Sequence, residues 1–252
     1  AFKIPIICVP ASIDNNLPGS ELSIGADTAL NNAVGALDSI KQSAAASHRC
    51  FVAESMGRKC GYLALMSGIA TGAERVYLHE DGLTLAQLAR DSARMVESFR
   101  SGRQLYLVIR NERASENYTL DVLAKIFAQE GRGLYDVRHA AIGHLQQGGD
   151  PSSFDRIMAT KLVAHALGLL ADQLEAGTHH SSYVGLMEGR ISHHRLERMN
   201  DELDLAARRP LHQWWMGLRD AIGLVSQNTG VLPLEGVPDF GASVSAAATA
   251  SD

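Results

Sequence analysis

The stretch Pro10-Ala11-Ser12-Ile13-Asp14-Asn15-Asn16 directly follows an apolar run, residues 4–9. A second stretch of the same kind, Glu54-Ser55-Met56-Gly57-Arg58-Lys59-Cys60-Gly61, follows the apolar run of residues 50–53. Each stretch places a charged residue in a turn between a predicted strand and a predicted helix. In a parallel sheet such turns open on the carboxyl edge, where ligands bind. The pattern predicts an α/β fold whose site lies where the carboxylate of the first stretch meets the guanidinium of the second.

Short apolar runs alternate with segments of helical periodicity along most of the chain. The other predicted strands span residues 75–78, 105–109 and 137–142, and the predicted helices span residues 84–99, 119–129 and 152–176. These repeated βα units predict a doubly wound, mostly parallel sheet with helices on both faces. Beyond them we expect a β-hairpin over residues 183–194, a short helix over residues 211–224 and a disordered tail over residues 228–252.

Length and composition exclude several classes of protein. With 252 residues and 46% hydrophobic content, the chain can bury a sizeable core and is expected to be a soluble globular protein. Its formal net charge of -5 argues against a general nucleic-acid binder, which needs a basic surface. No apolar run approaches the roughly 20 residues that span a bilayer, so no membrane contact is predicted.

The cysteines and histidines do not suggest a metal site. Cys8, Cys50 and Cys60 are odd in number and lie in or beside apolar segments, which is typical of free thiols in a reducing compartment such as the cytoplasm. The pairs His179-His180 and His193-His194 lack neighbouring cysteines or carboxylates, and adjacent residues on a strand point to opposite faces. Neither G-x-x-x-x-G-K-S/T nor G-x-G-x-x-G occurs, so a glycine-rich nucleotide cradle would lie outside this sequence.

The two charged turns are suited to phosphoryl transfer to a hydroxyl group. Asp14 can accept a hydroxyl proton, while the Ser12 hydroxyl and neighbouring amides can hydrogen-bond a transferring phosphoryl group. Gly57 lets the backbone approach a ligand, and Arg58 can stabilise the charge of an anion. Each feature has a plainer alternative, because Asp14 also suits a turn cap and Arg58 a solvated arginine beside a glycine turn.

Four further side chains are candidates for binding. His144 follows a predicted strand and either binds phosphate or a sugar hydroxyl or makes only structural hydrogen bonds. Glu112 also follows a strand and either accepts hydroxyl protons from a sugar or is a surface charge. Arg49 and Arg138 lie at or before strand starts, on the opposite edge, so they can reach the same ligand only from a neighbouring subunit.

Six short motifs occur in order along the chain. They are Ser12-Ile13-Asp14-Asn15, Ser23-Ile24-Gly25, Ser47-His48-Arg49, Met56-Gly57-Arg58-Lys59-Cys60-Gly61, Gly143-His144-Leu145-Gln146-Gln147-Gly148-Gly149 and Phe154-Asp155-Arg156. Together they resemble the phosphofructokinase family over nearly the whole chain, to about Leu224. The resemblance implies transfer of the terminal phosphoryl group of ATP to the 1-hydroxyl of fructose 6-phosphate, with Mg²⁺, as in glycolysis.

The resemblance implies a role for each matching residue. Asp14 matches the base that takes the proton from the sugar 1-hydroxyl, Ser12 the hydroxyl that helps hold the phosphoryl group, and Arg58 the arginine that stabilises its charge. The residues that match positions of the sugar-phosphate pocket are Met56, Gly57, Glu112, His144 and Gln147. Arg49 and Arg138 match arginines that reach the 6-phosphate from a neighbouring subunit, which implies an oligomer with a shared sugar site.

The resemblance also divides the chain. Residues 1–14 correspond to the end of the ATP-binding subdomain, and residues 15–227 to the sugar-phosphate-binding subdomain with returning segments. Most of the ATP site, including an aspartate for Mg²⁺, therefore lies outside this sequence, and the chain alone is not expected to turn over. Ala11 is small where pyrophosphate-using relatives have a lysine, which favours ATP as the donor.

Two departures from the family pattern leave an alternative open. Asn16 replaces an aspartate that helps organise Mg²⁺, and Gln147 replaces an arginine that binds phosphate. Together with flanking segments, they resemble the C-terminal half of tandem eukaryotic-type enzymes, where the sugar site usually binds the regulator fructose 2,6-bisphosphate. Such halves commonly lose the catalytic aspartate and arginine, whereas this chain keeps Asp14 and Arg58, so the catalytic interpretation is favoured.

Overall fold

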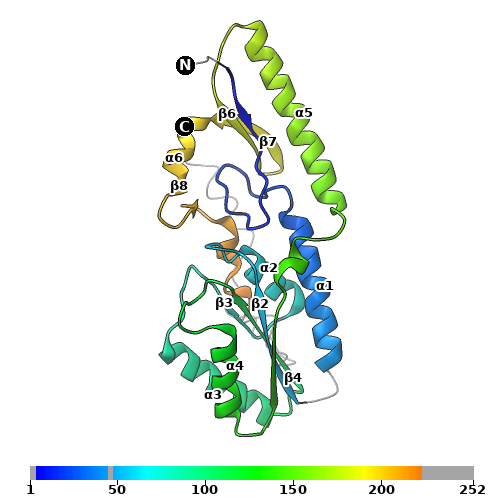
Figure 1. The fold of residues 1–252 in the computed structure, drawn as a ribbon, viewed down its shortest axis with the longest axis vertical. Helices are drawn as coiled ribbons and strands as arrows, with labels where there is room; N and C mark the ends of the chain where they lie inside the picture. Colours follow the sequence, from blue (N-terminus) through cyan, green and yellow to red (C-terminus); the bar gives the residue numbers. More distant parts are fainter. Residues whose placement is uncertain (1–3, 45–47, 223–252) are drawn as a thin grey trace, which may run out of the picture.

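Four parallel strands in the order β3-β4-β2-β5 form the main sheet, and a helix joins each strand to the next along the chain (Figure 1). The computed structural model describes residues 4–44 and 48–222. The strands are β2 (Arg49–Ser55), β3 (Arg75–Tyr77), β4 (Leu105–Asn111) and β5 (Asp136–Ala141). The four predicted strands in this part of the chain are confirmed, with ends shifted by two residues or fewer.

Helices cover both faces of this sheet. Helices α1 (Ala26–Ala44) and α2 (Tyr62–Thr71) lie on one face, and α3 (Leu85–Arg100) and α4 (Leu120–Gly131) lie on the other. Because side chains alternate along a strand, Cys50 and Val52 of β2 pack toward α3 and α4, whereas Ala53 packs toward α1 and α2. The doubly wound α/β fold is confirmed, and we call this unit the large lobe.

Hydroxyl side chains cap the starts of three helices. The Thr84 Oγ1 accepts a hydrogen bond from the backbone N–H of Gln87, and the Gln87 Oε1 accepts one from the Thr84 N–H, forming a capping box before α3. Thr119 caps α4, and Ser152 caps α5 (Ser153–Glu175). Each cap satisfies a backbone N–H that has no partner within the first turn of its helix.

A second sheet forms the small lobe. Its strands are β1 (Ile7–Cys8), β6 (Ser182–Met187) and β7 (Arg190–Arg195). Strand β1 pairs with β6 in parallel, and β6 pairs with β7 as an antiparallel hairpin, so the predicted hairpin is confirmed. The predicted strand over residues 4–9 is too long and belongs to this sheet instead of the main one. It is short because Pro5 has no N–H to donate and β6 is its one pairing partner among the described residues.

A few short elements connect the lobes and close the described chain. They are the 3₁₀ turn η1 (Gly143–Gln146), η2 (Leu196–Arg198), α6 (Met199–Glu202), the two-residue strands β8 (Leu203–Asp204) and β9 (Arg209–Pro210), and η3 (Trp214–Leu218). In place of one continuous helix over residues 211–224, the structure has the 3₁₀ turn η3, where Trp214 donates to the Glu21 carbonyl and Trp215 packs edge-on against Tyr62. Residues 221–222 are helical, and residues 223–224 lie outside the described residues. The predicted tail over residues 228–252 lies outside the described residues.

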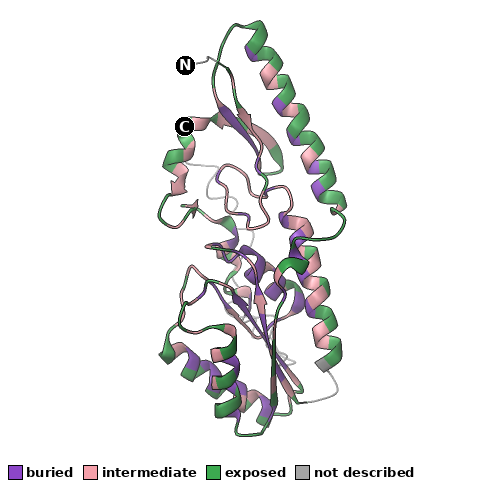
Figure 2. Ribbon diagram, in the orientation of Figure 1, coloured by how far each residue is buried: buried purple, intermediate pink, exposed green. Residues whose placement is uncertain are grey.

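Helix α5 is apolar on two sides. Met158, Leu162 and Ala166 pack on the small sheet beside Val184, whereas the opposite side leaves large apolar side chains in solvent (Figure 2). By length and composition alone α5 could cross a membrane, which the sequence did not lead us to expect. A single helix of this kind is a weak indication of a membrane span, since core helices pass the same test.

Candidate functional site

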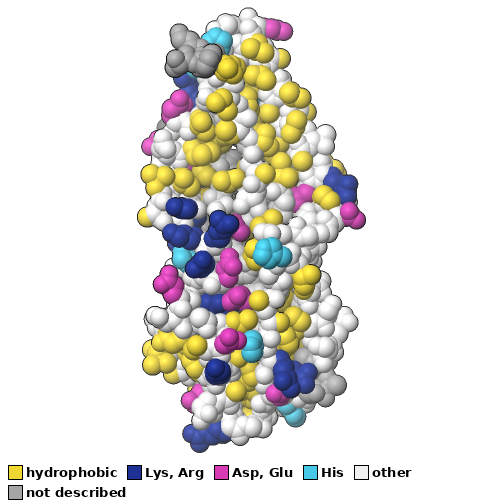
Figure 3. Space-filling view, in the orientation of Figure 1, with side chains coloured by type: hydrophobic (Ala, Val, Ile, Leu, Met, Phe, Trp, Pro, Cys, Tyr) yellow, Lys and Arg dark blue, Asp and Glu magenta, His cyan; other side chains and the backbone are white. Residues whose placement is uncertain are grey.

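The two charged turns meet at the junction of the lobes. The turn with Asp14 follows β1 of the small lobe, and the turn with Arg58 follows β2 of the large lobe. They therefore come together from two sheets, which corrects the expectation that they share the edge of one sheet. The Cys60 thiol donates to the Asn15 carbonyl across this junction, with 3.9 Å between the Sγ and O atoms. Figure 3 shows charged side chains gathered over this junction, beside the hydrophobic surface of the small lobe.

The carboxylate of Asp14 is close to two other predicted site residues. Burial raises the pKa of Asp14 above its ordinary value, and the negative charge of Glu112 raises it further. A hydrogen bond from the backbone N–H of Arg58 and the positive charge of its guanidinium act in the opposite direction. Arg58 and Glu112 are therefore near enough to Asp14 to influence the pKa of its carboxyl.

The turn that holds Asp14 is fixed by its own polar residues. Asn15 is buried and adopts a left-handed backbone conformation, φ 51°, which asparagine tolerates better than most residues. Its Oδ1 accepts from the Ser23 N–H at 2.8 Å, and its Nδ2 donates to the Glu21 carbonyl at 2.8 Å. The Ser12 Oγ accepts from the Asp14 N–H at 3.2 Å. These contacts set the direction of the Asp14 side chain.

The turn that holds Arg58 depends on Gly57 and on two buried amides. Gly57 has φ 128°, and a Cβ there would lie 2.3 Å from the Cys60 carbonyl oxygen. The Nδ2 of Asn111 donates to the Gly57 carbonyl at 2.6 Å and to the Cys60 carbonyl at 3.1 Å. Gln146 accepts from the Met56 N–H at 2.7 Å through Oε1. These amides hold the turn from within the large lobe.

Sequence reasoning gave no role to Asn111 or Gln146. Both are buried, with 0% and 1% of their surface exposed. Gln146 stands inside a motif that was recognised, and Asn111 precedes Glu112 at the end of β4, so position alone could have suggested them. Asp155 of the Phe-Asp-Arg motif is likewise buried and accepts from the N–H groups of Gly25 and Thr28, both at 2.9 Å, joining α5 to α1.

His144 and Gln147 lie at the end of β5, beside the turn of Asp14. A cavity of about 400 Å³ is lined by Ile13, Gln146, Gln147 and Gly149, among others, so the Asp14 turn and the 146–149 loop border the same space. The His144 and Gln147 side chains are exposed. Glu112 is half-buried and borders a second cavity, of about 560 Å³, near the ion pair of Arg110 and Glu54.

The two remaining candidates, Arg49 and Arg138, lie elsewhere. Arg49 begins β2 and Arg138 is near the start of β5, so both are on the edge of the main sheet opposite to Arg58. Both contact the Asp136 carboxylate, with Nε–Oδ2 distances of 3.5 Å and 2.9 Å. Within this chain they are therefore separated from the Asp14 turn by the length of the sheet.

The histidine pairs diverge, as adjacent strand residues do. His193 contacts His165 of α5, with 3.1 Å between the ring nitrogens, whereas His194 contacts Arg198. In residues 4–44 and 48–222, no group of three or more His, Cys, Asp or Glu side chains is arranged to hold a metal ion. Asn16 is also occupied, since its Oδ1 accepts from Ser12 and its Nδ2 donates to the Arg208 carbonyl. The residues that the structure describes therefore do not by themselves fit a Mg²⁺ site.

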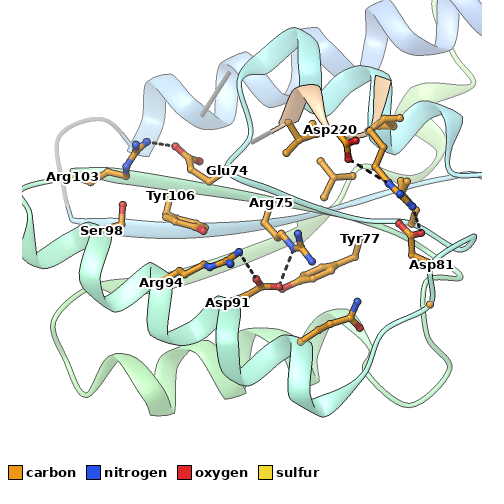
Figure 4. Close-up of a pocket in the computed structure, with 17 residues that line it drawn as sticks. Glu74, Arg75, Tyr77, Asp81, Asp91, Arg94, Ser98, Arg103, Tyr106 and Asp220 are labelled. Atoms are coloured by element: carbon orange, nitrogen blue, oxygen red, sulfur yellow. Dashed lines mark hydrogen bonds and ion pairs between the residues drawn. The ribbon is translucent and has the colours of Figure 1, made fainter. Parts of the chain in front are cut away.

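A cavity of about 900 Å³ lies beside β3, away from both charged turns (Figure 4). Figure 4 shows Arg75 and Tyr77 pointing to Asp91. The Arg75 Nε lies 2.9 Å and the Tyr77 hydroxyl oxygen 3.0 Å from the Asp91 Oδ2. Burial raises the pKa of Tyr77, and the Asp91 charge adds to this effect. None of the predicted site residues lines this cavity.

Comparison with known proteins gives a consistent result. A family model described as phosphofructokinase matches residues 1–170. The ATP-dependent 6-phosphofructokinase of Dictyostelium discoideum is 44% identical over 235 residues, which cover 92% of this chain and 28% of that protein. The human muscle-type ATP-dependent 6-phosphofructokinase is 37% identical over 235 residues, covering 89% of this chain and 30% of that protein.

Solved structures agree with the sequence matches. The phosphofructokinase of Pichia pastoris in the T-state aligns with a TM-score of 0.82 and 32% identity, over 91% of this chain and 28% of that one. The phosphofructokinase of Saccharomyces cerevisiae aligns with a TM-score of 0.82 and 33% identity, over 89% and 31%. The chain therefore spans less than a third of the length of these relatives.

Proposed function

Because this chain belongs to the phosphofructokinase family, we propose that it supplies the sugar-phosphate site and the catalytic base of an ATP-dependent 6-phosphofructokinase. The reaction transfers the terminal phosphoryl group of ATP to O1 of fructose 6-phosphate, giving fructose 1,6-bisphosphate in glycolysis. The chain matches less than a third of its relatives, so most of the ATP site belongs to a longer protein, and this chain alone does not turn over.

One observation supports this function above the others: the Asp14 carboxylate lies against the turn of Arg58. Burial and Glu112 raise the pKa of Asp14, which makes the carboxylate a stronger proton acceptor. Arg58 limits that rise and places a positive charge where a phosphoryl group would be transferred. A base and an anion-stabilising group within one small space are what this reaction needs.

In the proposed step, Asp14 takes the proton from the 1-hydroxyl as the sugar oxygen attacks the terminal phosphorus atom. The new O1–P bond forms while the bond from that phosphorus to the bridging oxygen breaks, and ADP leaves with the electron pair. Arg58 stabilises the negative charge of the transferring group. Ser12, whose hydroxyl donates to Asn16 in this structure, turns to donate to a phosphoryl oxygen.

The sugar phosphate is bound by side chains from several elements. Glu112 accepts from sugar hydroxyls, and His144 and Gln147 contact the sugar phosphate beside the backbone of Met56 and Gly57. Arg49 and Arg138 lie on the opposite edge, so they act on the sugar site of an adjacent subunit, and the active protein is an oligomer. Arginine suits this role because its planar guanidinium matches phosphate oxygens.

The division into subdomains is part of the same proposal. Residues 1–14 end an ATP-binding subdomain, and residues 15–227 form the sugar-phosphate subdomain with returning segments. The outer side of α5 exposes Leu167 and Leu174, with 61% and 60% of their surface accessible. A helix that is apolar on both sides is normally buried, so we propose that the rest of the longer protein covers it.

Mg²⁺ is proposed as the metal that the longer enzyme uses with ATP. When bound, it offsets the negative charge of the nucleotide phosphates. The described residues of this chain do not form its site, since Asn16 stands where the family has an aspartate, so no step is assigned to the ion here. A cytoplasmic location and allosteric control complete the proposal.

The test is Asp14→Asn in the intact protein. We expect turnover to fall by about 10³-fold or more, because the amide cannot accept the hydroxyl proton, while affinity for fructose 6-phosphate stays within about threefold. Turnover is measured by coupled assay and affinity by calorimetric titration. A variant with near-normal turnover would refute the proposed role of the carboxylate.

The same titrations address the regulatory alternative, which Asn16 and Gln147 favour. If this site is a sensor, fructose 2,6-bisphosphate binds more tightly than fructose 6-phosphate, and Asp14→Asn leaves activity unchanged. Preference for the monophosphate together with loss of turnover supports the catalytic assignment.

A further inference from the structure

Glu80 lies behind the turn of Arg58 and receives hydrogen bonds from three directions. It follows β3, and its side chain is 5% exposed. Its two carboxylate oxygens lie 3.0 Å and 3.1 Å from the Gly61 backbone nitrogen. Gln213 donates to it through Nε2 at 3.2 Å, and Arg209 Nη1 lies 3.3 Å away. All three partners are donors, so the position suits a carboxylate, which has only acceptor oxygens.

Gly61 makes this contact possible. It precedes α2, whose first turn has no side-chain cap of its own, and a Cβ at Gly61 would lie 2.7 Å from Oε2 of Glu80. The missing side chain allows the carboxylate to reach the backbone N–H at the start of the helix. A negative charge there is also favoured by the helix dipole. Glu80 therefore caps α2 from another part of the chain.

The β8–β9 hairpin binds the same turn from the other side. Arg209 Nη1 donates to the Lys59 carbonyl at 3.0 Å, and the Lys59 Nζ donates to the Ala206 carbonyl at 2.9 Å. The Arg208 carbonyl accepts from Asn16 at 3.4 Å, so the hairpin also touches the turn of Asp14. The segment after α6 thus links both charged turns, and Glu80 anchors it through Arg209.

We infer that Glu80 is a positioning residue, which with Arg209 holds the turn of residues 56–61 and so keeps Arg58 beside the turn of Asp14. The inference rests on the proposed function, because it gives Arg58 a task in phosphoryl transfer. Neither Glu80 nor Arg209 touches the reacting atoms. Their effect passes through the backbone of Lys59 and Gly61, which flank the turn on the side of α2.

The test compares Glu80→Gln and Arg209→Gln with Asp91→Asn in the intact protein. In Glu80→Gln, the new side-chain NH₂ group is a donor and faces groups that are themselves donors. Arg209→Gln removes the other partner of the ion pair, whose side chain is the more exposed of the two. Asp91 is the matched control, since it is a buried carboxylate paired with Arg75 that does not contact the turn. We expect kcat to fall about 10- to 100-fold in both test variants with the KM for the sugar within about threefold, and both constants unchanged in the control.

A second measurement does not depend on catalysis. Amide hydrogen exchange of residues 57–61 is expected to be faster in Glu80→Gln than in the parent protein and unchanged in Asp91→Asn. Three results would overturn the inference when the parent protein is active. They are a normal kcat in both test variants, an equal loss of kcat in Asp91→Asn, and unchanged amide exchange at Gly61 in Glu80→Gln. A parent protein that transfers no phosphoryl group would instead refute the proposed function, and the exchange result would still decide whether Glu80 holds the turn.

Discussion

The large lobe and the small lobe bury their helices differently. In the large lobe, two helices cover each face of a four-stranded parallel sheet, and the cores on both faces are closed. In the small lobe, a three-stranded sheet has one long helix, α5, packed on it, and that helix exposes apolar side chains on its outer side. Helices normally cover both faces of a parallel sheet, as they do in the large lobe, whereas the sheet of the small lobe is mixed. The exposed apolar side of α5 fits the proposal that the rest of the longer protein covers it.

The largest expected effect is in the closed core of the large lobe. Phe127 of α4 has no exposed surface and packs with Leu88, Met95 and Leu123. Phe127→Ala is expected to lower the free energy of unfolding by about 3–5 kcal/mol, since the surrounding side chains cannot collapse into the space. Denaturant unfolding followed by circular dichroism measures this loss.

Leu162→Ala in the small lobe is the matched comparison for that measurement. Leu162 also has no exposed surface, but its helix has no covering layer on the outer side in the described structure, so α5 can shift to fill part of the space. We expect a smaller loss when the chain is studied by itself, about 2–3 kcal/mol. Equal losses at the two positions would contradict the contrast between the lobes.

The next effect concerns the outer side of α5. Leu167→Gln is expected to lower the stability of the intact protein by about 1–3 kcal/mol, because we propose that the rest of the protein covers this side chain. Lys161→Gln, an exposed polar change on the same helix, is the control and should stay within about 0.5 kcal/mol. Thermal unfolding of both variants gives the comparison. If Leu167→Gln behaves like the control, the outer side of α5 faces solvent and the small lobe is complete.

The sequence was most informative where local patterns determine structure. Apolar runs bounded by polar turns identified the four strands of the main sheet, and segments of helical periodicity identified α3, α4 and α5. Periodicity could not show that β1 pairs with β6, because that contact joins Ile7 to Ser182 across most of the chain. The assignment of the two charged turns to a single sheet therefore had to come from the structure.

The same limit applies to the site. Asp14 and Arg58 were recognisable because each is a charged residue in a strand-to-helix turn and lies in a motif that resembles the phosphofructokinase family. The sequence did not identify three other residues that hold the site, Asn111, Gln146 and Glu80. Each forms side-chain hydrogen bonds with the backbone of a segment that is distant in sequence. A buried polar side chain needs a partner, but the sequence does not say which one.

The smallest expected effect is the pH dependence of stability at Asp14, at the boundary of the lobes. The folded protein raises the pKa of this carboxyl above its ordinary value, so between the two values the folded state binds more protons than the unfolded state. Stability therefore falls as the pH rises through that interval, and the loss remains at neutral pH. Asp14→Asn removes the buried charge and is expected to be slightly more stable than the parent at pH 7.

That gain should shrink as the pH is lowered and vanish below the ordinary pKa of the carboxyl, where the parent is protonated in both states. Asp38→Asn, which removes an exposed carboxylate on α1, is the control and should show no such pH-dependent gain. Unfolding midpoints across the pH series measure the difference. A variant that is less stable at pH 7 would mean that Arg58 stabilises the charge more than burial disfavours it. The charge of Asp14 would then stabilise the junction of the lobes. The destabilising burial that we expect of a proton-accepting carboxylate would be absent.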